Sequence, residues 1–233
     1  MDEKIDVSVI FPCRNEEGTV GICIDEAIGF FKSRGLSGEV IVVDNGSDDG
    51  SGVRAREHGA RVIEETPAGY GRALRAGIRE SIGDILLMCD CDTTYDISDF
   101  GKLYDMLRSG EYDMVIGDRF AGGIEPGAMP VSHIVGVQVL SAMGRSRFHA
   151  DVNDFHCGIR GMTAEAARKL VLRTDGMEFA TEMIAQAARA GMKTGQVPVR
   201  LKKSTLPRKS KLRTIRDGFR HLGYIYGVTQ RRQ

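Results

Sequence analysis

The chain of 233 residues is 42% hydrophobic, which is sufficient for one domain with its own core. Five cysteines, an odd number without CxxC spacing, argue against a disulfide framework and a zinc knuckle and favour a reducing compartment. An acidic N-terminus and the lack of an apolar run of about 18 residues predict a cytoplasmic chain without a signal peptide or a membrane span.

Positive charge is concentrated at the C-terminal end. Residues 200–233 contain eleven basic side chains and one acidic side chain, Asp217, so this segment carries about +10. The formal net charge of the whole chain is zero, and the preceding residues therefore carry about −10. Such a segment favours an anionic partner, either membrane headgroups or a phosphorylated substrate. It matches no nucleic-acid-binding motif, so we expect no nucleic-acid partner.

Short apolar runs rich in valine and isoleucine alternate with segments of helical spacing. The predicted strands are 7–11, 40–43, 61–63, 85–88 and 114–116, and the predicted helices between the first four are 19–31, 51–58 and 71–81. This alternation favours an α/β fold with a mostly parallel sheet covered by helices on both faces. Further along, we expect a loop at 122–130, a helix at 131–147, a turn or short strand at 154–160 and a helix at 178–190.

Polar residues follow four of the predicted strands. They are Pro12, Asn15 and Glu16 after the first strand, Asp44 after the second, Asp90 and Asp92 after the fourth, and Arg119 after the fifth. Because the carboxyl ends of parallel strands meet at one edge of the sheet, we expect these residues to form one ligand site.

The stretch LLMCDCDTTYD places Asp90 and Asp92 directly after a buried strand, with Cys91 between them. Two carboxylates at this position suit Mg²⁺ or Mn²⁺, which a diphosphate can share. The alternatives are that these aspartates turn the chain or cap a helix that begins near Ser98. The stretch also satisfies DxDxT, the nucleophile loop of haloacid dehalogenase-like phosphatases, but that reading leaves the polar loops after the first two strands unexplained.

Three further groups are candidates for binding nucleoside or phosphate. Asp44 can accept hydrogen bonds from a base or ribose, and capping of the helix from Ser51 is the alternative. In the GYGR stretch, Gly71 and Arg72 can approach a phosphate, although a dinucleotide-binding fingerprint is disfavoured because the third glycine is missing. Arg119 and Arg160 can bind phosphate bidentately, with a surface position as the alternative.

The segment from residue 206 onward is basic and amphipathic. Its apolar residues at spacings of three and four are Leu212, Ile215, Phe219, Leu222 and Ile225. We therefore divide the chain into a domain at 1–205 and a helical tail at 206–233. The stripe is consistent either with packing of a terminal helix on the core or with anchoring at an anionic membrane surface.

These motifs together resemble those of the family 2 glycosyltransferases of GT-A fold, and among them the polyprenyl-phosphate sugar synthases, which include dolichyl-phosphate hexose synthases. The matching stretches, in order, are FPCRNEE, IVVDNGSDDG, YGRAL, DCD, IGDRF, DFHCGIRG, MEFATEM and KSKL. They extend over residues 8–212, which is nearly the whole chain.

The resemblance implies inverting transfer of a hexose from a nucleoside diphosphate sugar, either a UDP-hexose or GDP-mannose, to a polyprenyl phosphate at the inner face of the membrane. In this family pattern each matching residue has an expected role. Pro12, Asn15, Glu16 and Asp44 would hold the nucleoside; Asp90, Cys91 and Asp92 the metal and donor; Gly71 and Arg72 the phosphates; and Arg119, Asp154, Arg160 and Lys211 the acceptor side or the diphosphate. A non-enzymatic alternative is a nucleotide-sugar-binding subunit that needs a membrane partner for activity.

Overall fold

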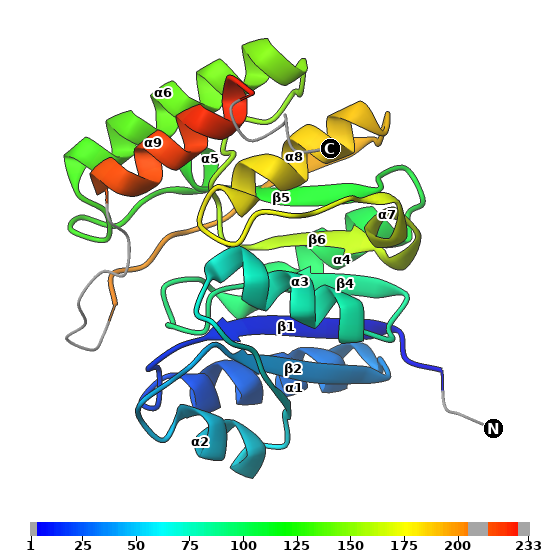
Figure 1. Cartoon of the computed structure of the whole chain (residues 1–233). Coiled ribbons are helices and arrows are strands. Elements are labelled where there is room, and N and C mark those ends of the chain that lie inside the picture. The colour runs from blue at the N-terminus through cyan, green and yellow to red at the C-terminus, as the bar shows by residue number, and fades with distance from the viewer. Residues whose placement is uncertain (1–3, 205–213, 228–233) are drawn as a thin grey trace.

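The computed structural model describes residues 4–204 and 214–227, and Figure 1 shows the chain as one sheet flanked by helices. Within these residues the strands are β1 (Val7–Cys13), β2 (Gly38–Asp44), β3 (Arg61–Glu64), β4 (Ile85–Met88), β5 (Met114–Asp118), β6 (Arg160–Thr163) and β7 (Thr194–Pro198). The helices are α1 (Val20–Arg34), α2 (Ser51–Glu57), α3 (Tyr70–Glu80), the 3-10 helix η1 (Ile97–Asp99), α4 (Phe100–Arg108), α5 (Arg119–Gly122), α6 (Val131–Phe148), α7 (Ala164–Lys169), α8 (Phe179–Arg189) and α9 (Thr214–Ile225).

The strands form one sheet in the order β3-β2-β1-β4-β6-β5-β7. Strand β6 runs antiparallel to its neighbours β4 and β5, whereas the other described pairs are parallel. All four residues of β4 are buried, as expected for a strand between two layers of helices. The mostly parallel α/β fold predicted from the sequence is confirmed.

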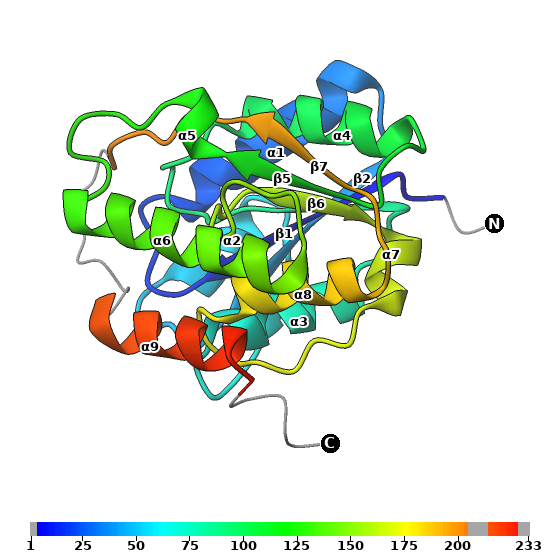
Figure 2. The ribbon, with the colours of Figure 1, turned by 90° about the horizontal axis from the view of Figure 1, so that it is seen from above.

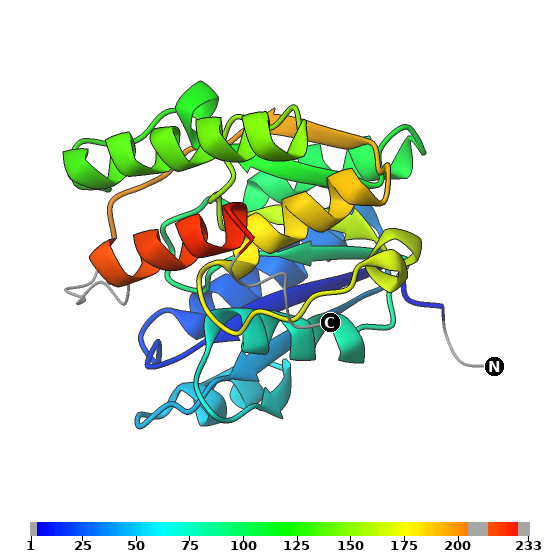
Figure 3. The ribbon, with the colours of Figure 1, turned by 45° about the horizontal axis from the view of Figure 1, so that its top comes forward.

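The helices form layers on the two faces of the sheet (Figure 2). Helices α1 and α4 cover one face, and α3 and α8 cover the other. Helices α6 and α9 lie side by side and both contact α8, so they form an outer layer beyond it (Figure 3). No helix within the described ranges has the length and apolar character needed to cross a membrane.

Most predicted elements agree with the structure, but α5, α7 and β7 were not predicted, and a helix beginning near Ser98 was considered only as an alternative to a metal site. Helix α4 follows η1, which begins after Asp96; the Asp96 side chain accepts a hydrogen bond from the Ser98 amide. Strand β7 has the sequence TGQVP, in which only alternate residues are buried, and it owes its position to pairing with β5. The predicted turn at 154–160 is a loop that leads into β6.

Helix α9 packs on the body through a face that differs from the predicted apolar stripe. Its buried residues include Asp217, His221, Tyr224 and Ile225, whereas Phe219 is 69% exposed. Within the stripe, Ile225 therefore packs on the core, whereas Phe219 does not, and anchoring through Phe219 stays a prediction. The predicted boundary near residue 205, Lys211 and Leu212 lie outside the described residues.

Candidate active site

A cavity of about 650 Å³ lies at the carboxyl ends of β1, β2 and β4. Its wall contains Pro12, Asn15, Glu16, Asp90, Cys91 and Asp92 from the predicted set. It also contains residues that were not predicted to form the site, namely Asn45, Tyr70, Arg216, Asp217 and Arg220. The sequence prediction that the loops after these strands meet at one site is thus matched by the geometry for β1 and β4.

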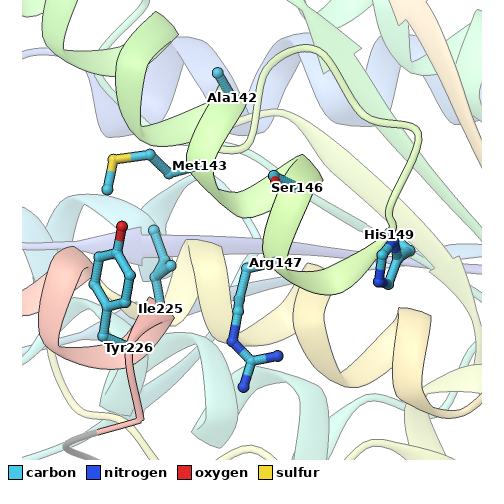
Figure 4. Close-up of a pocket in the computed structure, with 7 residues that line it drawn as sticks. All are labelled: Ala142, Met143, Ser146, Arg147, His149, Ile225 and Tyr226. Carbon is cyan, nitrogen blue, oxygen red and sulfur yellow. The ribbon is translucent and has the colours of Figure 1, made fainter.

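A second cavity of about 540 Å³ lies between α6 and α9, as Figure 4 shows. Its wall consists of Ala142, Met143, Ser146, Arg147, His149, Ile225 and Tyr226. None of these residues belongs to the predicted set, and none carries a carboxylate that could hold a divalent cation. The cavity at the strand ends is therefore the candidate active site.

The loops after β1 and β2 are joined by hydrogen bonds, which explains the polar residues in both motifs. The Asn15 amide donates to Ser47 Oγ at 3.0 Å, and Asn15 Oδ1 accepts from the Asp48 amide at 2.7 Å. The Glu16 amide donates to Ser51 Oγ at 2.8 Å. Asn15 adopts a positive φ of 54°, a left-handed conformation that asparagine tolerates better than most residues. These hydrogen bonds hold Asn15 and Glu16 against the loop after β2.

The acidic loop after β4 is held by a strained turn. Asp92 is almost fully buried, and its Oδ1 accepts hydrogen bonds from the amide and the hydroxyl of Thr94. Between them, Thr93 has a φ of 62°, which is unfavourable for a β-branched residue. Asp92 therefore does turn the chain, as one alternative predicted, while it also lines the cavity. Strain of this kind is found preferentially at functional sites.

Asp90 is held by Tyr70 and by a close approach of the loop before β6. The Tyr70 hydroxyl is hydrogen-bonded to Asp90, and burial together with the negative charge of Asp90 keeps the pKa of Tyr70 well above its ordinary value. Tyr70 therefore stays protonated and can donate to the carboxylate. A Cβ atom at Gly158 would lie 2.5 Å from Asp90 Oδ2, so a larger residue there would displace the Asp90 carboxylate. The tyrosine of the GYGR stretch was not predicted as a site residue.

Asp90 and Asp92 together fit a divalent cation. Both carboxylates line the same cavity, and carboxylate oxygens are the protein ligands that Mg²⁺ and Mn²⁺ prefer. Within residues 4–204 and 214–227 no group of three or more His, Cys, Asp or Glu side chains could hold a metal. The protein would thus supply two ligands, and the arrangement suits an ion completed by phosphate oxygens and water.

Cys91 lies in the cavity wall but is not a reactive thiol. Its Sγ donates to the Pro12 carbonyl oxygen at 3.4 Å. A hydrogen bond with Cys13 and, to a smaller extent, burial keep the pKa of Cys91 well above its ordinary value. Its thiol therefore stays protonated and links the loop after β4 to the end of β1.

The GYGR stretch contacts a neighbouring loop, and the predicted approach of its amides to a phosphate stays a prediction. The Gly71 amide donates to the Asp175 carbonyl oxygen at 3.0 Å, and a Cβ at Gly71 would lie 2.4 Å from the Thr174 carbonyl oxygen. Arg72 is paired with the Asp175 carboxylate at 2.7 Å. Neither Gly71 nor Arg72 lines the cavity. Gly71 contacts the backbone of residues 174–175, and Arg72 contacts the Asp175 side chain.

Asp44 also lies behind the cavity wall. Its Oδ1 accepts a hydrogen bond from the Ser47 amide at 2.9 Å, and its Oδ2 lies 2.8 Å from the position that a Cβ at Gly52 would take. Asp44 does not cap α2, whose N-cap residue is Gly50, and the nucleoside contact of Asp44 stays a prediction. The neighbouring Asn45 lines the cavity instead and accepts a hydrogen bond from the Gly69 amide.

Arg119, Asp154 and Arg160 form the buried support of the site. Arg119 makes a two-pronged ion pair with Asp154, with Nε to Oδ2 at 2.6 Å and Nη2 to Oδ1 at 2.8 Å. The guanidinium of Arg160 donates to the carbonyl oxygens of Cys157, Ala180 and Phe155. None of the three lines the cavity. Both guanidinium groups are buried and make their hydrogen bonds inside the protein, and their predicted contact with phosphate stays a prediction.

Two histidines join α9 to the loop before β6. His156 Nε2 lies 3.3 Å from His221 Nδ1, and Thr181 Oγ1 of α8 lies 2.8 Å from the same His221 atom. Burial lowers the pKa of His221 to about 4 and that of His156 well below its ordinary value, so both rings are neutral at pH 7. The sequence offered no signal for this pairing, since the two residues lie 65 positions apart.

Solved structures of two sugar synthases share this fold, which is the GT-A fold. The glucosyl-3-phosphoglycerate synthase of Mycobacterium tuberculosis, solved with Mn²⁺, UDP and glucosyl-3-phosphoglycerate, has a TM-score of 0.73 and 24% identity, covering 96% of this chain and 80% of that chain. The mannosyl-3-phosphoglycerate synthase of Rubrobacter xylanophilus has a TM-score of 0.76 and 20% identity, covering 97% and 74%.

Residues 8–171 match the model of glycosyl transferase family 2, and the chain belongs to this family. In Haloferax volcanii, the low-salt glycan biosynthesis hexosyltransferase Agl6 is 35% identical over 94% of this chain and 52% of its own length. The dolichyl-phosphate hexose transferase of the same organism is 31% identical over 83% of this chain and 82% of its own length. The chain thus spans about half of the former and most of the latter. The family match leaves the haloacid dehalogenase alternative without support.

Proposed function

We propose that this chain transfers a hexose from a UDP-hexose or GDP-mannose, bound with Mg²⁺ or Mn²⁺, to a polyprenyl phosphate. The observation that carries this proposal is the pair Asp90 and Asp92 in one cavity with the end of β1. Two further findings support it. The dolichyl-phosphate hexose transferase of Haloferax volcanii is a relative, and a structural neighbour was solved with Mn²⁺ and UDP-glucose.

Within this proposal the cavity wall has two parts. Pro12, Asn15 and Glu16 contact the nucleoside, because they project from the rigid loop after β1. Asp90 and Asp92 hold the cation, which neutralises the leaving diphosphate when it is bound. Asp44, Gly71, Arg72, Arg119, Asp154 and Arg160 act as positioning residues behind this wall, in place of the direct contacts expected from the sequence.

A phosphate acceptor does not need a strong general base from the protein. A phosphate monoester has a second pKa near 6 and is largely a dianion at neutral pH. Its oxygen can attack the anomeric carbon directly, with inversion, while the bond to the nucleoside diphosphate breaks. The protein then contributes mainly alignment of the two substrates and stabilisation of the charge on the leaving group.

The acceptor would be reached at a membrane surface. Residues 200–233 carry eleven basic side chains against one acidic side chain. The outer layer exposes several apolar side chains. They are Val131, Val135 and Val139 of α6, Phe219 of α9, and Tyr226 just after α9. Exposed apolar side chains beside concentrated positive charge are suited to the interface of an anionic bilayer.

A transfer assay tests the proposed reaction. Purified protein is incubated with Mn²⁺, a short-chain prenyl phosphate and a panel of UDP- and GDP-sugars, and the glycosylated lipid is detected by mass spectrometry. We expect one donor to give a prenyl-phosphate hexose. Donor binding without product would favour the nucleotide-sugar-binding subunit, and addition of a membrane fraction would then restore turnover. Failure to bind any donor would refute both.

Vesicle co-sedimentation tests the membrane contact. Binding should increase with the fraction of anionic lipid and decrease with salt, because each basic residue near the surface contributes about 1 kcal/mol. Absent or charge-independent binding would refute the electrostatic contact.

A further inference from the structure

Helix α9 supplies residues to the candidate active site that no motif indicated. Arg216, Asp217 and Arg220 line the same cavity as Asp90 and Asp92. Helix α9 is held in this place by its contacts with α6 and α8 and by the hydrogen bond between His221 and Thr181. The C-terminal helix is therefore part of the site wall, and the two arginines bring positive charge to it.

The two arginines are placed differently. The Arg220 Nε lies 3.1 Å from Glu178 Oε2, a buried carboxylate oxygen for which no hydrogen bond is found among the described residues. A Cβ at Gly176, another residue of the wall, would lie 2.5 Å from Arg220 Nη1, so the guanidinium lies directly over this glycine. The contact of Arg220 Nε with Glu178 thus orients the guanidinium group. Arg216 is exposed, and it forms no hydrogen bond or ion pair with the residues that the structure describes.

The cavity needs positive charge beyond a metal if it is to hold two phosphorylated substrates. A cation on Asp90 and Asp92 has its charge offset by those carboxylates and by the diphosphate of a donor. A second dianion then requires its own partners, and arginine binds phosphate with two parallel hydrogen bonds. Arg119 and Arg160 are buried and do not line this cavity, and they make hydrogen bonds with Asp154 and with backbone carbonyl oxygens.

We propose that Arg216 and Arg220 of α9 bind the phosphate group of the acceptor. This inference rests on the proposed function, and it assigns the acceptor half of the site to the C-terminal helix. Glu178 fixes Arg220, and Arg216 completes the phosphate site from the neighbouring turn of the same helix, four residues away. The donor is held by the loops after β1 and β4, so loss of either arginine should weaken acceptor binding and leave nucleotide binding intact.

Calorimetric titration tests this division. The wild-type chain, Arg216→Gln, Arg220→Gln and the control Arg147→Gln are each titrated with UDP or GDP plus Mg²⁺, and then with a short-chain prenyl phosphate or inorganic phosphate. Arg147 is an exposed arginine of α6 outside this cavity, so its loss removes the same charge from the same outer layer. Because Arg216 is exposed, Arg216→Gln should leave the fold intact. It therefore tests the proposal even if Arg220→Gln, which removes the ion-pair partner of the buried Glu178 carboxylate, destabilises the fold.

We expect the dissociation constant for prenyl phosphate to rise at least tenfold in Arg216→Gln and in Arg220→Gln, with nucleotide affinity within twofold of wild type and Arg147→Gln unchanged. Weaker binding of both prenyl phosphate and inorganic phosphate would support contact of the arginines with the phosphate group. Weaker binding of prenyl phosphate alone would place the arginines against the prenyl chain and contradict the inference. Unchanged acceptor binding in Arg216→Gln, or no phosphate binding by wild type, would overturn the inference. Transfer by the wild-type enzyme would uphold the proposed function in either case.

Discussion

Replacement of Asp154 by asparagine should destabilise the protein strongly, because it removes one charge of a buried pair. The Asp154 side chain is fully buried, that of Arg119 is 7% exposed, and the carboxylate also accepts from the His156 amide at 3.2 Å. Asparagine keeps the shape but leaves the guanidinium without a counter-charge. Breaking a buried pair in this way costs about 3–5 kcal/mol, a large share of a total stability of about 5–15 kcal/mol.

Urea unfolding followed by circular dichroism measures this cost against a matched control. With a slope of about 3 kcal/mol per M, the midpoint for Asp154→Asn should fall by about 1 M or more. The control is Asp105→Asn, since Asp105 pairs with Arg34 in the same two-pronged manner at the surface, with side chains 58% and 36% exposed. That change should cost less than about 1 kcal/mol. Equal costs in the two variants would refute a supporting role for the buried pair.

Three further predictions follow from other parts of the site. As the pH falls from 6.5 to 4, the protein should lose about 3 kcal/mol of stability through His221, because burial lowers the folded-state pKa of His221 to about 4 and the unfolded chain, with a pKa of about 6.5, takes up the proton first. His221→Gln should lack this pH-dependent loss. The same dependence of stability on pH in His221→Gln and wild type would contradict the prediction. Arg160→Lys should lower the free energy of unfolding by at least about 2 kcal/mol, since lysine cannot reach three carbonyl oxygens at once; a stability equal to wild type would return Arg160 to the list of phosphate ligands. Thr93→Gly should raise the unfolding free energy by about 0.5–1 kcal/mol by relieving the positive φ, as measured by urea unfolding. A lower unfolding free energy would contradict this prediction.

The fold was predictable because its signals are local. The alternation of apolar strands and helical segments is visible over short windows, and β4 was predicted with its observed bounds of Ile85–Met88. Strand β7 was not predicted, because TGQVP has few apolar residues and becomes a strand only by pairing with β5. Its identity as a strand depends on tertiary context, which a short window does not contain.

The site was predictable only as far as residues leave the strands directly. Asp90 and Asp92 line the cavity because they follow β4, which the sequence shows. Arg119 and Arg160 stand in motifs of equal prominence, but the sequence does not show that Arg119 pairs with Asp154 or that Arg160 bonds to the Ala180 carbonyl oxygen. Arg216 and Arg220 were seen only as charge of a basic tail, because the position of α9 against the cavity depends on packing with α6 and α8.

The most direct test of the account is metal-dependent nucleotide binding. UDP and GDP are titrated into the wild-type chain and into Asp92→Asn, with Mn²⁺ or with EDTA; asparagine retains an oxygen that can accept the Thr94 hydrogen bonds. The account predicts that one nucleotide binds with Mn²⁺ and that EDTA or Asp92→Asn each weakens its binding at least tenfold, about 1.4 kcal/mol. Equal affinity in EDTA, or in Asp92→Asn with Mn²⁺, would contradict the role of the two aspartates as the metal site.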